Sequence, residues 1–101
     1  MTASGVTASG ITVRSDVSKM SKRPKRIAIE WKKLSTAWGW AYTDEHRIEL
    51  DPRMDERTLL EVASHEVGHI VLPEVPEDKI DLLGKQIANV LWRVGFRRED
   101  A

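Results

Sequence analysis

The sequence predicts an α+β domain in which three short strands are followed by two helices. Two patterns predict this order. Apolar residues alternate with polar or small ones across residues 27–50, and they recur every three or four positions across residues 56–94. Because the strand patterns all precede the helical ones, we expect a three-stranded antiparallel sheet and two packed helices. A length of 101 residues allows one such domain, expected over residues 26–98.

The three expected strands alternate with a period of two. Ile27, Ile29 and Trp31 alternate in the first, Trp38, Trp40 and Tyr42 in the second, and Ile48 and Leu50 in the third. The polar residues 43–45 between the second and third strands predict a hairpin. The tryptophans at positions 31, 38 and 40 are expected in the core rather than on a ligand-binding surface.

The first helix is expected from about Glu56 to Leu72, because Asp55 is a favourable N-cap and Pro73 cannot continue the helix. Its apolar residues gather on one side of a helical wheel, and this side is expected to face the core. They are Leu59, Leu60, Ala63, Val67, Ile70 and Val71.

The second helix is expected from Pro76, as its first residue, to about Val94, with Gly95 as its C-cap. It also carries an apolar stripe that is expected to pack on the core, with Gly84 at the edge of the stripe. The stripe consists of Ile80, Leu83, Ile87, Val90, Leu91 and Val94.

Residues 65–69 of the first helix read His-Glu-Val-Gly-His, the pattern HExxH. Two histidines four residues apart present their imidazoles on one face of a helix, near enough to share one zinc ion. His65 and His69 fall nearly opposite the apolar side of the wheel, so we expect them to face a cleft. Glu66 lies beside them, where a carboxylate can accept a proton from water on the metal. Gly68 adds no side chain that would crowd the site.

A third metal ligand must come from elsewhere in the chain, which contains no cysteine. Of the acids that follow the motif, Glu77 lies nearest the packed face of the second helix and is favoured as this ligand. Glu74 and Asp81 remain alternatives. Tyr42 and His46 flank the hairpin turn, where either could donate a hydrogen bond to an oxyanion, although a plain surface position is favoured for His46.

The motif and its surroundings resemble a known group of enzymes. Residues 61–70, Glu-Val-Ala-Ser-His-Glu-Val-Gly-His-Ile, follow a strand that ends in Leu-Asp-Pro at residues 50–52. This resembles the zincin metallopeptidases, and more closely the small bacterial and phage proteins of the SprT-like and ImmA/IrrE-like kind. The resemblance covers residues 26–98 and implies a minimal zincin-like fold. It also implies that His65 and His69 are zinc ligands and that Glu66 is the general base.

A downstream acidic ligand is typical of gluzincins within this group, and Glu77 fits that position. The metzincin pattern does not continue, because no third histidine follows in HExxHxxGxxH spacing. The domain is also close to the minimum size, so a shallow cleft, or one completed by a partner, is expected.

Composition excludes several other classes. The absence of cysteine excludes a disulfide scaffold, an iron–sulfur cluster and a cysteine-based zinc site. Sixteen basic and sixteen acidic residues balance, which argues against dedicated nucleic-acid binding. No apolar run approaches the ~18 residues needed to span a bilayer, and no signal-peptide pattern opens the chain. A cytoplasmic protein is therefore expected.

Residues 1–25 are expected to form a disordered leader followed by a basic segment. The leader is rich in Ser, Thr, Gly and Ala, and it lacks large apolar anchors. From Met20 onward the sequence looks more like the start of an ordinary protein. Translation from Met1 and translation from Met20 therefore remain alternatives. The cluster from Lys22 to Arg26 is expected to be a solvated tail, with a weak contact to nucleic acid or an acidic partner as the alternative.

The function expected from these features is zinc-dependent hydrolysis of peptide bonds, with a peptide or protein as substrate. An extended substrate is expected to add to the free edge of the sheet. The alternative is a non-catalytic regulatory or interaction module, such as one that a phage encodes, that zinc only stabilises. Glu66 favours the enzyme, because a structural site needs no base between its histidines.

Overall fold

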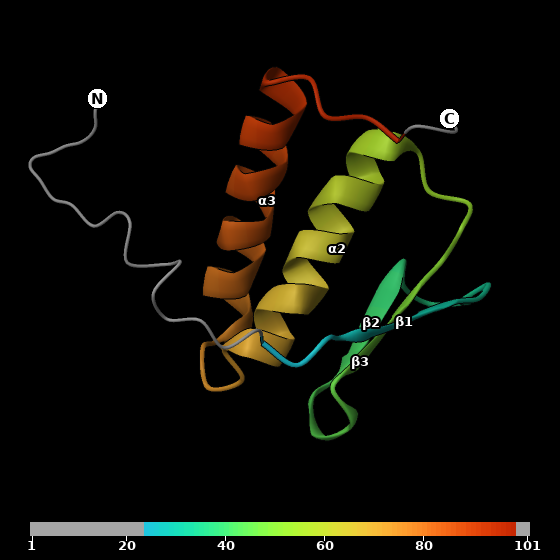
Figure 1. Ribbon diagram of the computed structural model, residues 1–101, viewed down its shortest axis with the longest axis vertical. Coiled ribbons are helices and arrows are strands. Elements are labelled where there is room, and N and C mark those ends of the chain that lie inside the picture. The colour runs from blue at the N-terminus through green and yellow to red at the C-terminus, as the bar shows by residue number, and fades with distance from the viewer. Residues whose placement is uncertain (1–23, 99–101) are drawn as a thin grey trace, which may run out of the picture.

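Residues 24–98, the part of the chain that the structure describes, form a three-stranded sheet packed against a pair of helices (Figure 1). The structure is a computed structural model. The strands are β1 (Ala28–Trp31), β2 (Gly39–Tyr42) and β3 (Arg47–Leu50), and the helices are α2 (Glu56–Val71) and α3 (Glu77–Arg93). The predicted α+β class and the order of its elements are confirmed. Most of the predicted leader, including Met20, lies outside the described residues.

The sheet is mixed, with strand order β1-β3-β2. β2 pairs antiparallel with β3 as the predicted hairpin, through a 3-10 turn, η1, at Thr43–Glu45. β1 pairs parallel with β3, so the prediction of a wholly antiparallel sheet was wrong. Alternation of apolar residues is the same in both kinds of ladder, and the sequence pattern therefore does not report strand direction.

A buried carboxylate explains how β1 and β2 come to lie on opposite edges. The segment that joins them runs past the end of β3, where Asp51 is fully buried. One oxygen of Asp51 accepts a hydrogen bond from Leu34 N at 2.9 Å, and the other accepts from Arg53 N at 2.9 Å. The Arg53 guanidinium also bonds both oxygens, and it holds the pKa of Asp51 well below its usual range. These bonds fix the crossing segment and leave the central position to β3.

The helix boundaries follow the predicted caps to within one residue. The Asp55 side chain accepts from Thr58 N at 2.8 Å and caps α2, which ends before Pro73. Pro76 is the N-cap residue of α3 rather than its first helical residue. Gly95 follows the last turn with φ of 98°, a left-handed conformation that glycine adopts without strain. None of the described helices is long and apolar enough to cross a membrane.

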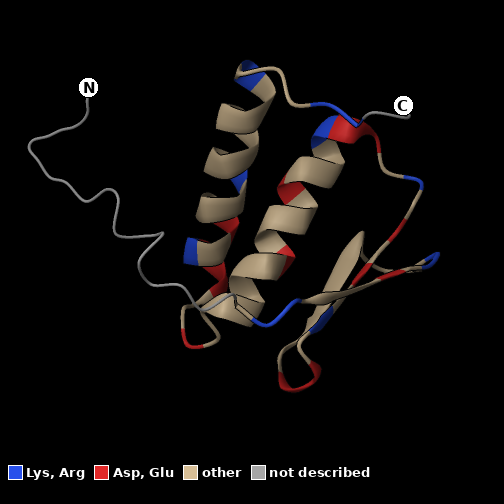
Figure 2. Ribbon diagram, viewed as in Figure 1, with Lys and Arg blue, Asp and Glu red and all other residues tan. Residues whose placement is uncertain are grey.

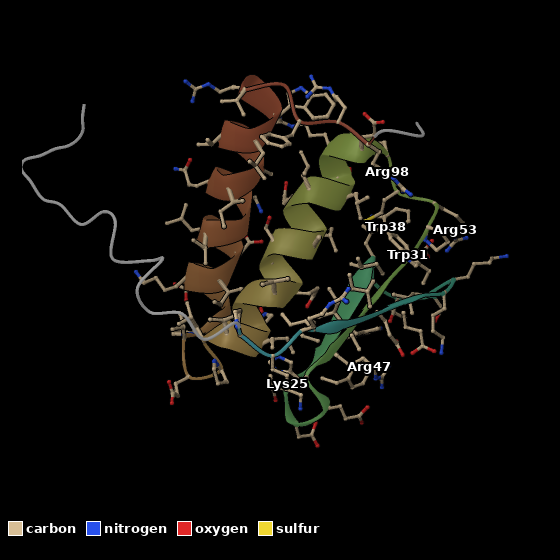
Figure 3. The ribbon with its side chains drawn as sticks, viewed as in Figure 1. Lys25, Trp31, Trp38, Arg47, Arg53 and Arg98 are labelled. Carbon is tan, nitrogen blue, oxygen red and sulfur yellow. The ribbon has the colours of Figure 1, made fainter. Side chains whose placement is uncertain are left out.

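The core lies between α2 and the two strands that it covers, β2 and β3. Ile48, Leu50, Met54 and Ile70 are its buried centre. The tryptophans at positions 31, 38 and 40 are 44–46% exposed, so the prediction that they form the core was wrong. The reason is that α2 does not cover β1, and Trp40 pairs with Glu49 on the outer face of the sheet. Trp31 is approached instead by the Arg98 guanidinium, 5.4 Å from the ring centre (Figure 3).

The predicted apolar stripes of both helices were also partly wrong. On α3, the residues buried against α2 are Ile80, Gly84 and Ala88. Leu83, Ile87, Val90 and Val94 are exposed, as are Val67 and Val71 on α2. The helices approach each other through small residues, and this rotates the larger apolar side chains out of the interface.

Candidate metal centre

The two histidines of the motif lie on the last two turns of α2 and point at a common position. Their Nε2 atoms are 3.1 Å apart, and their rings meet edge to face with centres 4.8 Å apart. Both side chains are largely buried, at 16% and 24% exposed. The i, i+4 spacing of His65 and His69 therefore produces the shared position that the sequence predicts.

Glu77 completes a cluster with these histidines from the first turn of α3. One carboxylate oxygen lies 3.0 Å from His65 Nε2, and the other lies 2.8 Å from His69 Nε2. The three residues are a group whose ligand atoms all lie within 4.8 Å of one another. Among the acids that the sequence leaves open, Glu77 is the one whose oxygens meet both Nε2 atoms.

Two glycines explain why α3 comes close enough to bring Glu77 to the histidines. A Cβ on Gly84 would lie 3.1 Å from both Glu61 O and His65 N on the backbone of α2. A Cβ on Gly68 would meet the Ile80 side chain at 3.2 Å. Gly68 thus serves helix packing, whereas the sequence suggests that it keeps the metal site open. With Gly84 against the backbone of α2 and Gly68 against Ile80, α3 runs back along α2 (Figure 1), and Glu77 in its first turn meets His69.

The donor set fits a zinc ion. Zinc in proteins is held by imidazole nitrogens and carboxylate oxygens at about 2.0–2.2 Å, which places tetrahedral ligand atoms roughly 3.3 Å apart. The Nε2 atoms of His65 and His69 are 3.1 Å apart, and each lies within 3.0 Å of a different oxygen of Glu77, so the three side chains converge on one position. Zinc held by these three side chains would keep a fourth position open, as in catalytic rather than structural sites.

Asp81 lies one turn after Glu77 and meets the other nitrogen of His65. Its Oδ1 is 3.4 Å from His65 Nδ1, on the side of the ring away from Glu77. Lys85 donates to Asp81 at 2.7 Å and lies 3.2 Å from Glu61 on α2. This ammonium group holds the pKa of Asp81 below its ordinary value. The structure therefore places Asp81 behind a candidate ligand, and not among the three ligand atoms.

Glu66 lies on the sheet side of α2, only 9% exposed. Burial raises the pKa of its carboxyl group, and the neighbouring His65 and His69 oppose that rise. No hydrogen bond joins Glu66 to any other residue among 24–98. Buried polar groups are nearly always hydrogen-bonded, so a carboxylate without a partner beside two histidines calls for a functional explanation.

A small cleft of about 180 Å³ opens beside Glu66 and His65. The segment before β2 and the start of that strand form its other wall, through Ala37, Trp38 and Gly39. A Cβ on Gly39 would come within 2.8 Å of Val62 Cγ1 and 3.1 Å of Glu66 Cγ, so only glycine allows β2 this close to α2. Sequence reasoning missed Trp38 and Gly39 as site residues. A glycine inside a strand pattern is the signal that indicates such a close approach.

Three other residues that the sequence suggests for the site lie outside the cluster. Glu74 is exposed in the turn between the helices and does not belong to the cluster. His46 has a left-handed φ of 53°, and its Nε2 lies 3.1 Å from Lys25 O. Tyr42 donates to Glu49 at 3.1 Å on the outer face of the sheet. Tyr42 and His46, which the sequence suggests as possible oxyanion donors, therefore have partners elsewhere and do not line the cleft beside Glu66.

No family model, curated protein or solved structure matches this chain. The case for a function therefore rests on the geometry of the cluster and on the chemistry of its side chains.

Proposed function

We propose that this chain is a zinc-dependent metallopeptidase in which His65, His69 and Glu77 hold the metal. The observation that carries the proposal is the buried carboxylate of Glu66 beside the histidine pair, which has no hydrogen-bond partner among residues 24–98. A site that only stabilises a fold needs ligands and no free carboxylate. A general base needs a carboxylate that is held in place, largely dry and not engaged with another group.

Glu66 is suited to move protons during hydrolysis. A zinc ion in this cluster would supply a Lewis acid that polarises a carbonyl and lowers the pKa of water. The Glu66 carboxylate would take a proton from the attacking water and return it to the departing amine nitrogen.

β2 offers the edge on which an extended peptide would lie. β2 is an edge strand, and Trp38 O accepts from Asp51 N at 2.9 Å in the ladder with β3. Because hydrogen-bonded and non-hydrogen-bonded pairs alternate in an antiparallel ladder, the amides of Gly39 and Ala41 point away from β3. An added strand would bond to these groups and pass the cleft that Glu66 lines. Trp38, 46% exposed at the same cleft, would contact a substrate side chain.

The experiment that tests the proposal compares wild type with Glu66→Gln for zinc content and for cleavage of an unstructured peptide mixture. The variant should keep zinc, because Glu66 is not among the three ligand atoms, and should lose about 10²–10⁴-fold in rate. Glu74→Gln is the matched control and should retain full activity. A wild-type protein that binds zinc and cleaves nothing, or equal rates in wild type and Glu66→Gln, would instead favour a zinc-stabilised regulatory module.

A further inference from the structure

The helices carry an exposed apolar face on the side away from the metal cluster. We define this back face as Val67 and Val71 of α2 with Leu83, Ile87, Val90 and Val94 at and beyond α3. Val67 follows His65 by two residues and so lies about 200° round the helix from it. Val71, Val90 and Val94 are 62%, 51% and 64% exposed.

A groove runs along the back face between the two helices. Its volume is about 380 Å³. Its floor is made by small residues, Ala63, Ser64 and Gly68, and its walls by larger apolar ones on each side. None of the residues that line the groove is charged, and α2 carries no Lys, Arg, Asp or Glu after Glu66 (Figure 2).

The back face is complementary to itself. Beside the groove, Ile87, Val90 and Val94 follow one another at i, i+3 and i+7, so they form a continuous ridge along α3. Helices pack by placing the ridge of one into the groove of another. A surface that carries both a groove and an adjacent ridge can satisfy both contacts with a second copy related by a two-fold axis.

The area available is enough for a weak but specific dimer. The exposed parts of the back-face residues amount to roughly 500 Å² per copy, so a two-fold pairing would bury at most about 1,000 Å², near the lower limit for a specific interface and typical of a weak one. The uncharged groove gives no electrostatic preference for another partner. The chain has a net charge of zero, so two copies do not repel each other.

A second copy would also supply burial that one copy lacks. Only six hydrophobic residues among 24–98 are buried in the single chain, and two of them, Met54 and Ile70, remain 9% and 7% exposed. Small domains gain limited stability from their own cores and often rely on association for more. We propose that two copies of this chain associate through the back face, with the ridge of each copy lying in the groove of the other. The proposal does not depend on metal binding or on activity.

Sedimentation equilibrium of the full chain, between about 1 and 300 μM, tests the proposal. Wild type should show a reversible monomer–dimer equilibrium. Val90→Lys should weaken the dimer at least tenfold, because it places a charge at the centre of an apolar contact. Leu82→Lys is the matched control. Leu82 is on the same helix, 55% exposed and outside the groove, so this variant should dimerise like wild type.

Val71→Lys on α2 supplies a second variant at a position that is more exposed still, and circular dichroism establishes that each variant is folded. It should also weaken the dimer, because the interface spans both helices. A wild-type chain that stays monomeric at 300 μM overturns the proposal. So does a dimer that Val71→Lys and Val90→Lys leave intact, a dimer equally weakened by Leu82→Lys, or an assembly larger than two.

Discussion

Asp81 lies against Nδ1 of His65, while Nε2 of the same ring faces Glu77. The two nitrogens of one imidazole thus contact two carboxylates that come from consecutive turns of α3. A carboxylate that accepts from Nδ1–H fixes the tautomer and leaves Nε2 free to bind a metal ion. The spacing of Glu77 and Asp81, four residues apart on one helix face, makes this arrangement possible.

The first prediction is that Asp81→Ala lowers zinc affinity about 10–100-fold without abolishing binding, the usual effect of losing a group behind a ligand. Competition with a chromogenic chelator measures the affinity. Asp78→Ala is the control, because Asp78 is exposed on the same helix and belongs neither to the candidate ligands nor to the Asp81–His65 contact. Unchanged affinity in Asp81→Ala would show that the contact with His65 does not matter for metal binding.

The second prediction is that Glu77→Ala weakens zinc binding far more than Asp81→Ala does. Removing one of three ligands leaves only two histidines, so a loss of several orders of magnitude is expected from a site whose total binding free energy is of the order of 10 kcal/mol. Glu74→Ala should bind zinc like wild type. If Glu74→Ala were the variant that lost the metal, the cluster described above would not be the binding site.

The third prediction concerns the close approach of β2 and α2. Gly39→Ala should lower the free energy of unfolding by about 1–3 kcal/mol, because the new methyl group meets Val62 at 2.8 Å. Thermal unfolding measures this loss. The double variant Gly39→Ala/Val62→Ala removes Val62 Cγ1, the atom that the new methyl group would meet, and should recover part of the lost stability. No recovery would mean that the contact with backbone oxygen of Glu49, at 3.2 Å, dominates instead.

The fourth prediction concerns pH. The pKa of Asp51 is lowered by Arg53 and by backbone donors, so its ionised form is favoured in the folded state. Its contribution to stability is therefore fully present above the unfolded pKa of about 3.9 and is lost as the pH falls through the lower folded value. Asp51→Asn should melt roughly 5–10 °C below wild type at pH 7.

The difference in melting temperature between wild type and Asp51→Asn should shrink below about pH 4, because the unfolded wild-type chain then binds a proton at Asp51 while the folded chain does not. Scanning calorimetry from pH 7 to pH 3 follows both proteins. A gap that stays constant over this range would show that the charge of Asp51 contributes nothing to folding.

Local signals in the sequence predicted the elements well. Asp55 as an N-cap and Pro73 as a stop set the ends of α2 to within a residue, because capping and proline sterics act over a few bonds. The shared position of His65 and His69 also follows from helix geometry alone. The placement of Glu77 beside them was expected from helical phase, and its oxygens do lie against both nitrogens.

Features that depend on two separated segments were harder to predict. The parallel pairing of β1 is accompanied by a hydrogen bond from Leu34 N to Asp51, seventeen residues further along the chain, and no period in the sequence reports it. The choice of Gly84 and Ala88, rather than Leu83 and Ile87, as the α2-facing side of α3 depends on how closely two helices can approach. A helical wheel ranks residues by their hydrophobicity, so it underestimates small residues at positions where two helices pack closely.

The strand order β1-β3-β2 has a consequence for how the chain folds. The β2–β3 hairpin and the α2–α3 pair each join segments that are neighbours in sequence, so each can form early at a small cost in loop closure. β1 can be added only after β3 is in place, since β3 provides its entire ladder. We therefore expect the Ala28 and Lys32 amides, which bond His46 O and Leu50 O, to exchange with solvent through partial openings that leave the metal cluster intact.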